Sequence, residues 1–205
     1  MKSATSPGEG CAAQAGFTLA ELLVVASIIA IVIGMSIPSL SRAIDNAKLK
    51  GATQTLVAVY QDGRIRATQN NTSYQVLVST AGINPAQVCV DLDGNGTCSA
   101  GDPMTPISAG VTLNNNGVPP GLNITLGFPT VQTENSSGAR SLTWNGLGTP
   151  CQRSSASLPC AGWVQYLQLP RSGSDALYAA VTVSPTGRVR TWTYIPSGNG
   201  NGSWF

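Results

Sequence analysis

One loop of the chain carries oxygen-bearing side chains at the spacing of a calcium site. Calcium loops of the EF-hand type place oxygen ligands at positions 1, 3, 5, 7, 9 and 12 and a glycine at position 6. In residues 91–102 these ligand positions hold Asp91, Asp93, Asn95, the Thr97 carbonyl, Ser99 and Asp102, with Gly96 sixth. Asp102 replaces the bidentate glutamate of such loops. The spacing makes Ca²⁺ a candidate ligand, although no cofactor is required.

The same loop also fits ordinary turn chemistry. Asp and Asn are common in turns because their side chains accept hydrogen bonds from nearby backbone N–H groups. The loop follows a strand-like run from Val88 to Val90, and Pro103 prevents an immediate helical continuation. These features favour a metal-free, hydrated turn, and calcium binding is the second interpretation.

A group of charged and aromatic side chains lies near the C-terminus. Residues 181–194 predict a strand, a tight turn and a second strand, with Pro185 and Gly187 suited to the turn. Alternation along the second strand places four side chains on one face, namely Arg188, Arg190, Trp192 and Tyr194. The β-branched side chains of Val189, Thr191 and Thr193 lie on the other face, which can pack inward.

Two interpretations of this hairpin stay open. Two guanidinium groups beside two aromatic rings suit phosphate binding and base stacking, so Arg188, Arg190 and Trp192 are candidate DNA contacts. The alternative, which we favour, is an edge strand that its arginines protect from aggregation.

The composition excludes several classes of enzyme. The 205 residues include 11 Lys+Arg, 9 Asp+Glu and no histidine. A Ser-His-Asp triad, a Cys-His pair, a His-ligated zinc and a histidine general base are therefore excluded. We do not expect an enzyme. Because the net charge is only +2, any site for nucleic acid must be local.

Four of the five cysteines form two close pairs, and only Cys11 stands apart. The pairs are Cys89 with Cys98 and Cys151 with Cys160, and each would close a polar loop of the kind that an oxidising compartment such as the periplasm permits. Four cysteines allow three connectivities, which the sequence alone does not distinguish. The wide spacing within each pair disfavours zinc.

The element that must position these groups begins with the most apolar stretch of the chain. From Phe17 to Ile37, Glu21 is the only charged residue. As a helix these residues rise roughly 31 Å, enough to cross a bilayer once. A polar leader, residues 1–16, precedes the stretch, whereas a secretory signal peptide is cleaved after its apolar run. We therefore expect residues 17–37 to form a retained transmembrane helix, in which Glu21 needs a cationic partner.

Beyond Pro38 the pattern becomes amphipathic and predicts that the helix continues over residues 38–69, ending near Arg66 or Thr68. Arg64 and Arg66 suit the last turn, where cations complement the helix dipole. The apolar stripe expected to pack on the head consists of Leu40, Ile44, Ala47, Gly51, Leu56, Val59 and Tyr60. Residues 70–205 predict a β-rich globular head. The fold class is therefore α+β, a long N-terminal helix packed on a mostly antiparallel sheet.

The head contains short runs with strand patterns, separated by Gly, Pro and Asn clusters. The predicted strands cover residues 74–78, 88–90, 111–113, 123–126, 142–144, 163–169, 177–183 and 188–194. Residues 197–203 are interpreted as a flexible tail before Trp204 and Phe205.

The residues around Gly16 resemble the processing site of type IV pilins and of the pseudopilins of type II secretion. The matching residues are Gly16, Phe17, Thr18, Leu19, Glu21 and Leu22, followed by the apolar run. The resemblance implies a pilin fold, cleavage between Gly16 and Phe17 by a prepilin peptidase, and N-methylation of Phe17. It also implies that Glu21 neutralises this amine on a neighbouring subunit and that Pro38 kinks the helix. The leader departs from the pattern, since Lys2 is its only basic side chain.

The head is similar to that of FimT/GspH-type minor pilins and pseudopilins. The likeness rests on the acidic, glycine-rich turn and on the C-terminal run Gly187-Arg188-Val189-Arg190. Some FimT-type minor pilins use such a Gly-Arg-x-Arg element to bind DNA during natural transformation. The resemblance therefore implies DNA as a candidate partner.

The function implied is structural. The expected protein is a minor pseudopilin or pilin subunit, stored in the bacterial inner membrane as a single-pass protein with its head in the periplasm. It would assemble with other pilin or pseudopilin subunits into a type II secretion pseudopilus, for protein secretion, or into a type IV pilus. A FimT-like DNA-binding minor pilin is the alternative. Residues 17–38 do not distinguish the two filament systems, because the N-terminal helices of both kinds of subunit insert into the membrane and assemble in the same way.

Overall fold

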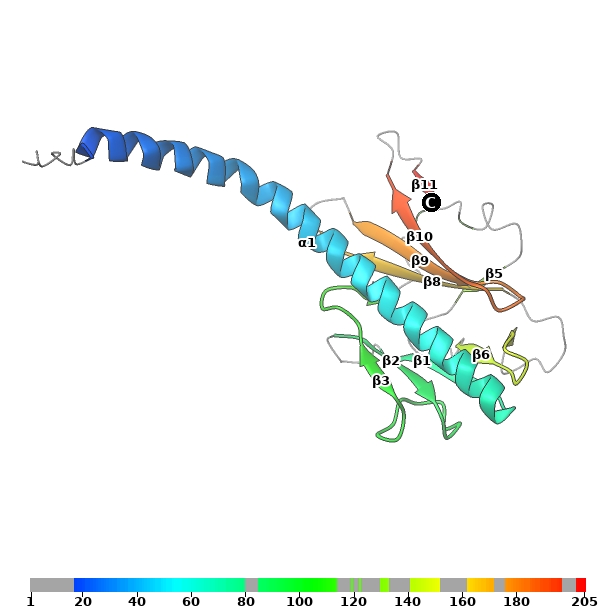
Figure 1. Ribbon diagram of the computed structural model, residues 1–205. Helices are drawn as coiled ribbons and strands as arrows, with labels where there is room; N and C mark the ends of the chain where they lie inside the picture. Colours follow the sequence, from blue (N-terminus) through cyan, green and yellow to red (C-terminus); the bar gives the residue numbers. More distant parts are fainter. Residues whose placement is uncertain are drawn as a thin grey trace, which may run out of the picture. The chain divides into compact units, whose positions relative to one another are not determined.

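The computed structural model describes residues 17–79, 85–113, 119, 122, 130–132, 141–151, 162–171, 176–196 and 202–205. The chain divides into two compact units, residues 1–42 and residues 43–205. One helix, α1 (Leu19–Asn70), belongs to both units, and the second unit also contains the strands (Figure 1).

Both ends of α1 are capped. Thr18 precedes the helix, and its Oγ1 accepts a hydrogen bond of 3.2 Å from the backbone N–H of Glu21. At the other end Asn71 has a positive φ of 48°, and the N–H of Thr72 donates to the carbonyl of Ala67 at 3.2 Å. This is a Schellman-type stop. The helix therefore ends a little later than the predicted Arg66 or Thr68, because the cap and not the amphipathic pattern decides the end.

Two sheets follow α1. The strands of the first are β1 (Tyr74–Ser79), β2 (Gln87–Asp91), β3 (Met104–Pro106), β6 (Leu142–Trp144) and β7 (Pro150–Cys151), in the order β3-β2-β1-β6-β7. The strands of the second are β4 (Thr112–Leu113), β8 (Gly162–Leu169), β9 (Leu177–Val183), β10 (Val189–Ile195) and β11 (Ser203–Trp204), in the order β11-β10-β9-β8-β4. A further strand, β5 (Thr130–Gln132), pairs with β8 in parallel, and the other pairs are antiparallel. The α+β class is confirmed.

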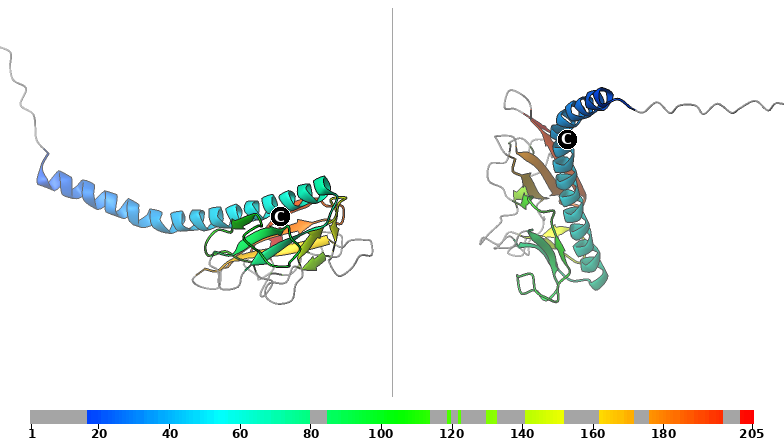
Figure 2. Two further views of the ribbon diagram at one scale, coloured as in Figure 1. Left: turned by 90° about the horizontal axis from the view of Figure 1, so that it is seen from below. Right: turned by 90° about the vertical axis from the view of Figure 1, so that its left-hand side faces the viewer.

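The main core lies between the C-terminal part of α1 and both sheets, which lie on the same side of that part of the helix (Figure 2). The helix contributes Leu49, Ala52, Leu56, Val59, Tyr60 and Ala67, a stripe of three- and four-residue steps. Leu56, Val59 and Tyr60 were predicted. Leu40, Ile44 and Ala47 were expected on the stripe but are exposed, and Leu49 and Ala52 are buried instead.

A second, smaller core lies on the other face of the second sheet. It consists of Leu122, Val164, Tyr166, Ala180 and Trp204, with Tyr178, Trp192 and Tyr194 packed against it. Trp204 comes from β11, which pairs with β10. The prediction of a flexible tail was therefore wrong for Ser203, because the aromatic ring of Trp204 anchors this end of the chain. The strand predicted at residues 123–126 lies outside the described residues.

Candidate functional site

The N-terminal segment begins in the structure at Phe17, whose side chain is 80 % exposed. Gly16, on the other side of the expected cleavage site, lies outside the described residues. Glu21 occupies the third position of α1, and its backbone N–H donates to Thr18 Oγ1. Thr18 and Glu21 thus have the spacing of a capping box, in which Thr18 caps the first turn of the helix.

The first part of α1 exposes apolar side chains on all sides. Leu19, Leu22, Leu23, Ile28, Ile31 and Val32 are each more than half exposed. Within the residues that the structure describes, no helical segment has the combination of length and apolar character that a membrane span needs. The span expected over residues 17–37 stays a prediction. Pro38 lies within α1, but its side chain is outside the description, and the implied kink stays a prediction as well.

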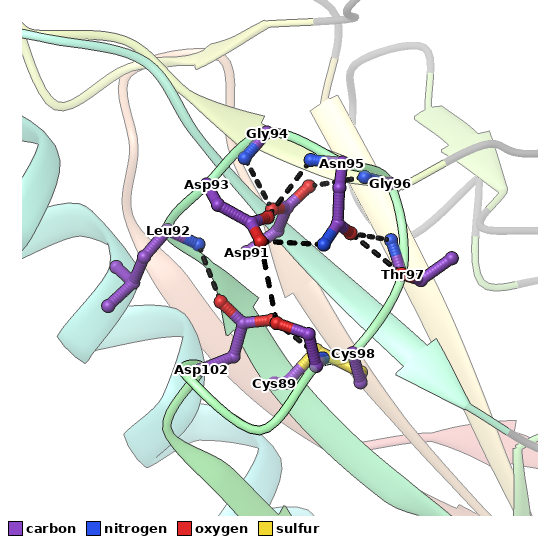
Figure 3. The surroundings of a disulfide bond; sticks show 11 residues. Cys89, Asp91, Leu92, Asp93, Gly94, Asn95, Gly96, Thr97, Cys98 and Asp102 are labelled. Atoms are coloured by element: carbon purple, nitrogen blue, oxygen red, sulfur yellow. Dashed lines mark hydrogen bonds between the residues drawn. A yellow bond between two sulfur atoms is a disulfide. The ribbon is translucent and has the colours of Figure 1, made fainter.

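The acidic loop is a dense hydrogen-bonded turn after β2 (Figure 3). Asp91 is 1 % exposed, and its two carboxylate oxygens accept the N–H groups of Gly94 at 2.7 Å and Gly96 at 2.9 Å. Asp102 is 7 % exposed and accepts the N–H groups of Leu92 at 2.9 Å and Ser99 at 2.8 Å. These two buried carboxylates therefore organise the loop by satisfying its backbone donors.

Carboxylate oxygens of Asp91, Asp93 and Asp102 lie within 4.8 Å of one another, as a shared cation would require. Asn95, however, directs its amide oxygen to the N–H and the hydroxyl of Thr97, both at 2.7 Å. Its amide nitrogen donates to Asp93 at 2.6 Å. Hydrogen bonds within the loop thus explain the positions of its acidic side chains without a metal, which favours the interpretation as a metal-free turn. Calcium binding stays a prediction.

The hydrogen bonds also act on the ionisation of the loop. The backbone N–H groups of Leu92 and Ser99 lower the pKa of Asp102, which outweighs the opposing effect of burial. A lowered pKa means that the charged form stabilises the fold. This contribution is fully present above the ordinary carboxyl pKa of about 3.9 and is lost as the pH falls through the lower value of the folded state.

Replacing Asp102 by asparagine is expected to lower the free energy of unfolding by about 1–3 kcal/mol, because an amide NH₂ would meet an N–H donor. The difference from the wild type should shrink as the pH falls from about 3.9 towards the lowered pKa of the folded state, because the carboxyl is protonated first in the unfolded chain. Urea melts at several pH values measure both effects. Asp93→Asn is the matched control and should change stability less than Asp102→Asn, because the bonds that Asp93 accepts from Asn95 are exposed to water.

The same melts with calcium or with a chelator test the metal. The hydrogen-bonded turn predicts no shift of the midpoint at millimolar calcium. A calcium-dependent rise that Asp93→Asn abolishes would establish the cation site instead.

One predicted disulfide is confirmed. Cys89 and Cys98 are bonded, with a Cα–Cα distance of 5.8 Å, and the bridge joins β2 to the acidic loop (Figure 3). Cys151 ends β7, but Cys160 lies outside the described residues, so the bridge Cys151–Cys160 stays a prediction.

The turn of the β9–β10 hairpin depends on the backbone conformation of Gly187. Gly187 has a φ of +84°, and its N–H donates to the carbonyl of Ser184 at 2.8 Å. A Cβ on Gly187 would overlap the carbonyl oxygen of Gly148, in the turn between β6 and β7, and would touch the guanidinium of Arg64. Gly187 therefore allows the two sheets and α1 to meet closely at this point.

Arg64 of α1 links the helix to the turn of the β9–β10 hairpin. Its Nη1 donates to the carbonyl oxygen of Gly187 at 2.9 Å, and its guanidinium lies 5.7 Å from the ring centroid of buried Trp144. The expectation that Arg64 and Arg66 serve the last turn of α1 was wrong, since that turn holds no basic residue. Arg66 instead pairs with Asp62 at 2.7 Å.

Arg188 and Arg190 of the hairpin are exposed, and neither has a carboxylate partner among the described residues.

The aromatic side chains of the hairpin are not exposed beside these arginines, contrary to the sequence prediction. Trp192 and Tyr194 pack against the second core; Trp192 Nε1 donates to Thr182 Oγ1 at 2.8 Å, and the Tyr194 ring lies 5.2 Å from that of Trp204. Thr191 and Thr193, expected to pack inward, are exposed. The strand alternates as predicted, but its aromatic face is already occupied by Trp204 and its neighbours.

Comparison with known proteins bears on the N-terminal segment. Residues 11–37 match the model of the prokaryotic N-terminal methylation motif. No curated protein and no solved structure matches the chain. The matched motif is typical of type IV pilin-like proteins in pili and secretion systems. It implies processing by a prepilin peptidase and assembly with other pilin subunits, and it includes Gly16, Phe17 and Glu21.

Proposed function

We propose that the chain is a minor subunit of a type II secretion pseudopilus or of a type IV pilus. The observation that carries the proposal is the methylation motif over residues 11–37, whose apolar side chains lie exposed on the first part of α1. Before assembly the helix spans the bacterial inner membrane once, with the head in the periplasm. In the filament the same side chains are buried against neighbouring subunits, which removes them from lipid and water.

The head faces outward in this proposal and carries the properties specific to the subunit. It resembles FimT/GspH-type minor subunits in its acidic turn and its Gly-Arg-x-Arg hairpin. The test of assembly is whether the chain is recovered in sheared filaments, and whether recovery depends on the Glu21 carboxylate. Loss of protein secretion or of pili on deletion of the gene distinguishes the two filament systems.

The alternative function is DNA binding by the hairpin during natural transformation. It is supported by the exposed guanidinium groups of Arg188 and Arg190, which have no carboxylate partner in the described part of the head. The placement of Trp192 and Tyr194 favours contacts to phosphates over stacking on bases, because both rings pack against other aromatic side chains.

Removing both guanidinium groups is expected to weaken the binding of duplex DNA and to reduce its salt dependence. With Arg188→Ala plus Arg190→Ala, the plot of log K against log salt concentration should become less steep, its negative slope losing about 2 in magnitude, since each lost phosphate contact removes about 0.9. Fluorescence anisotropy with the mature chain in detergent measures both quantities. Lys48→Ala plus Lys50→Ala removes the same charge from two exposed positions of α1 and should have little effect. Equal affinity and slope in the arginine variant would eliminate this surface as the DNA contact.

A further inference from the structure

One edge of β10 is only partly covered. β9 pairs with β10 from Val189 to Thr193, but on the opposite edge β11 pairs only with Tyr194 and Ile195. Beyond them Thr193 and Phe205 exchange both backbone hydrogen bonds, at 2.9 and 3.1 Å. In the portion of the head that the structure describes, no strand pairs with this edge from Val189 to Trp192.

The open edge presents backbone groups that can pair. In an antiparallel strand the hydrogen-bonding groups of alternate residues point to the same edge. Since Thr193 bonds outward to Phe205, the N–H and C=O groups of Thr191 and Val189 also point outward. Thr191 is exposed and Val189 is partly buried, so the groups of Thr191 in particular are accessible to a further strand.

The chain itself shows how a strand binds here. β11 runs antiparallel to β10, and Trp204 is buried beside Tyr194 and Tyr166, with ring centroids 5.2 and 5.9 Å apart. A guest strand that continues the line of β11 would stand opposite Val189, Arg190 and Thr191. Main-chain hydrogen bonds would give it affinity, and the side chains directly opposite would give it specificity.

Charge determines which guest fits. Side chains directly opposite each other on neighbouring strands have Cβ atoms about 4.5–5.5 Å apart, so like charges repel and unlike charges attract there. Arg188, which directly precedes β10, and Arg190 are both exposed and have no carboxylate partner among the residues described. A second copy of β10 would bring arginines near arginines, whereas carboxylates opposite Arg188 and Arg190 would pair with them.

We propose that the open edge of β10 binds an extended, acidic segment of a partner protein by strand addition. The segment carries carboxylates at two alternate positions, opposite Arg190 and Arg188, with β-branched residues opposite Thr191 and Val189. The site uses the backbone of β10 as well as its charges, and in this it differs from DNA binding by the same arginines.

The probe is a fluorescent peptide, acetyl-Thr-Val-Glu-Val-Glu-amide, titrated with the mature chain in detergent. Two peptide controls separate backbone pairing from charge. N-methylation of both valines blocks the hydrogen bonds to Thr191 and Val189, and replacement of both glutamates by lysine reverses the charge. Both changes should weaken binding by at least about tenfold, since each removes two favourable contacts.

Variants of the protein test the same contacts with the peptide unchanged. Thr191→Pro removes the outward N–H without touching a hydrogen bond to β9, because proline is tolerated on edge strands. It should weaken peptide binding by at least about tenfold, whereas Thr191→Val, which keeps the N–H, should bind normally. Arg188→Ala plus Arg190→Ala should also weaken binding and reduce its salt dependence.

The peptide results decide the proposal even if Thr191→Pro fails to fold. Absence of binding at millimolar peptide would overturn it and would leave the arginines as protection of an edge strand. Equal binding of the N-methylated peptide would also overturn it, since charge alone would then explain the contact. DNA binding that is lost in the arginine variant and unchanged in Thr191→Pro, without any peptide binding, would assign the surface to nucleic acid instead.

Discussion

Replacing Glu21 by alanine is expected to remove the chain almost completely from sheared filaments while leaving it in the membrane fraction. In the proposed filament the carboxylate of Glu21 lies among apolar helices and pairs with the N-terminal amine of Phe17 on a neighbouring subunit. Removing one partner of a buried ion pair costs about 3–5 kcal/mol, because the other charge is left buried and unpaired. Incorporation should therefore fall by more than about a hundredfold, measured by immunoblot of both fractions.

Two further variants separate the charge of Glu21 from its place in the helix cap. Glutamine keeps the capping-box geometry and removes the charge, so Glu21→Gln should be as defective as Glu21→Ala. Thr18→Ala removes the hydroxyl that accepts the Glu21 N–H, at a cost of about 1 kcal/mol, and should still assemble. Normal incorporation of Glu21→Gln, or a Thr18→Ala defect as severe as that of Glu21→Ala, would show that the cap and not the charge is needed.

Replacing Gly187 by alanine is expected to lower the free energy of unfolding by about 3 kcal/mol. A non-glycine residue at a φ of +84° is strained, and the added Cβ would overlap the Gly148 carbonyl and press on Arg64. In a domain of this size that loss corresponds to a decrease of roughly 6–12 °C in Tm. Thermal melts of the mature chain followed by circular dichroism measure it.

Gly94→Ala is the matched control for this substitution. Gly94 also has a positive φ, of 73°, but nothing lies within 4 Å of an added Cβ. It should cost only about 1–2 kcal/mol, the penalty of the backbone conformation itself. If the two variants lost the same stability, the junction of Gly187, Gly148 and Arg64 would have no importance beyond the φ angle.

Local patterns in the sequence identified most of the secondary structure. The predicted strands at residues 142–144 and 177–183 have the observed bounds of β6 and β9, because each is a short apolar run between turn residues. The long helix was identified by its apolar run and its three- and four-residue steps. Its end was missed by a few residues, since a Schellman motif at Asn71 is not visible in the hydrophobic pattern.

Contacts between distant residues could not be predicted. Arg64 and Gly187 are 123 residues apart, and nothing in the sequence pairs a helix arginine with a hairpin glycine. The outward placement of Trp192 and Tyr194 failed for the same reason. Strand alternation gives the face on which a side chain lies, but the burial of that face depends on Trp204 and Leu122, which come from other parts of the chain.

The acidic loop shows a different limit. Its spacing fits a calcium loop, but spacing does not say where oxygen atoms point. In the structure the oxygens of Asp91 and Asp102 accept backbone N–H groups, and the Asn95 oxygen accepts from Thr97. A sequence template contains no information on this competition between backbone donors and a cation.

If the chain is processed and assembled as a type IV pilin-like subunit, its mature N-terminus carries the mark of that processing, and the mass of this N-terminus tests the proposal. The chain should be purified from its own membranes, digested and analysed by mass spectrometry. The proposed function predicts an N-terminal peptide that begins at Phe17 and carries one methyl group on its amine. A mature chain in which Gly16 and Phe17 are still joined would contradict it.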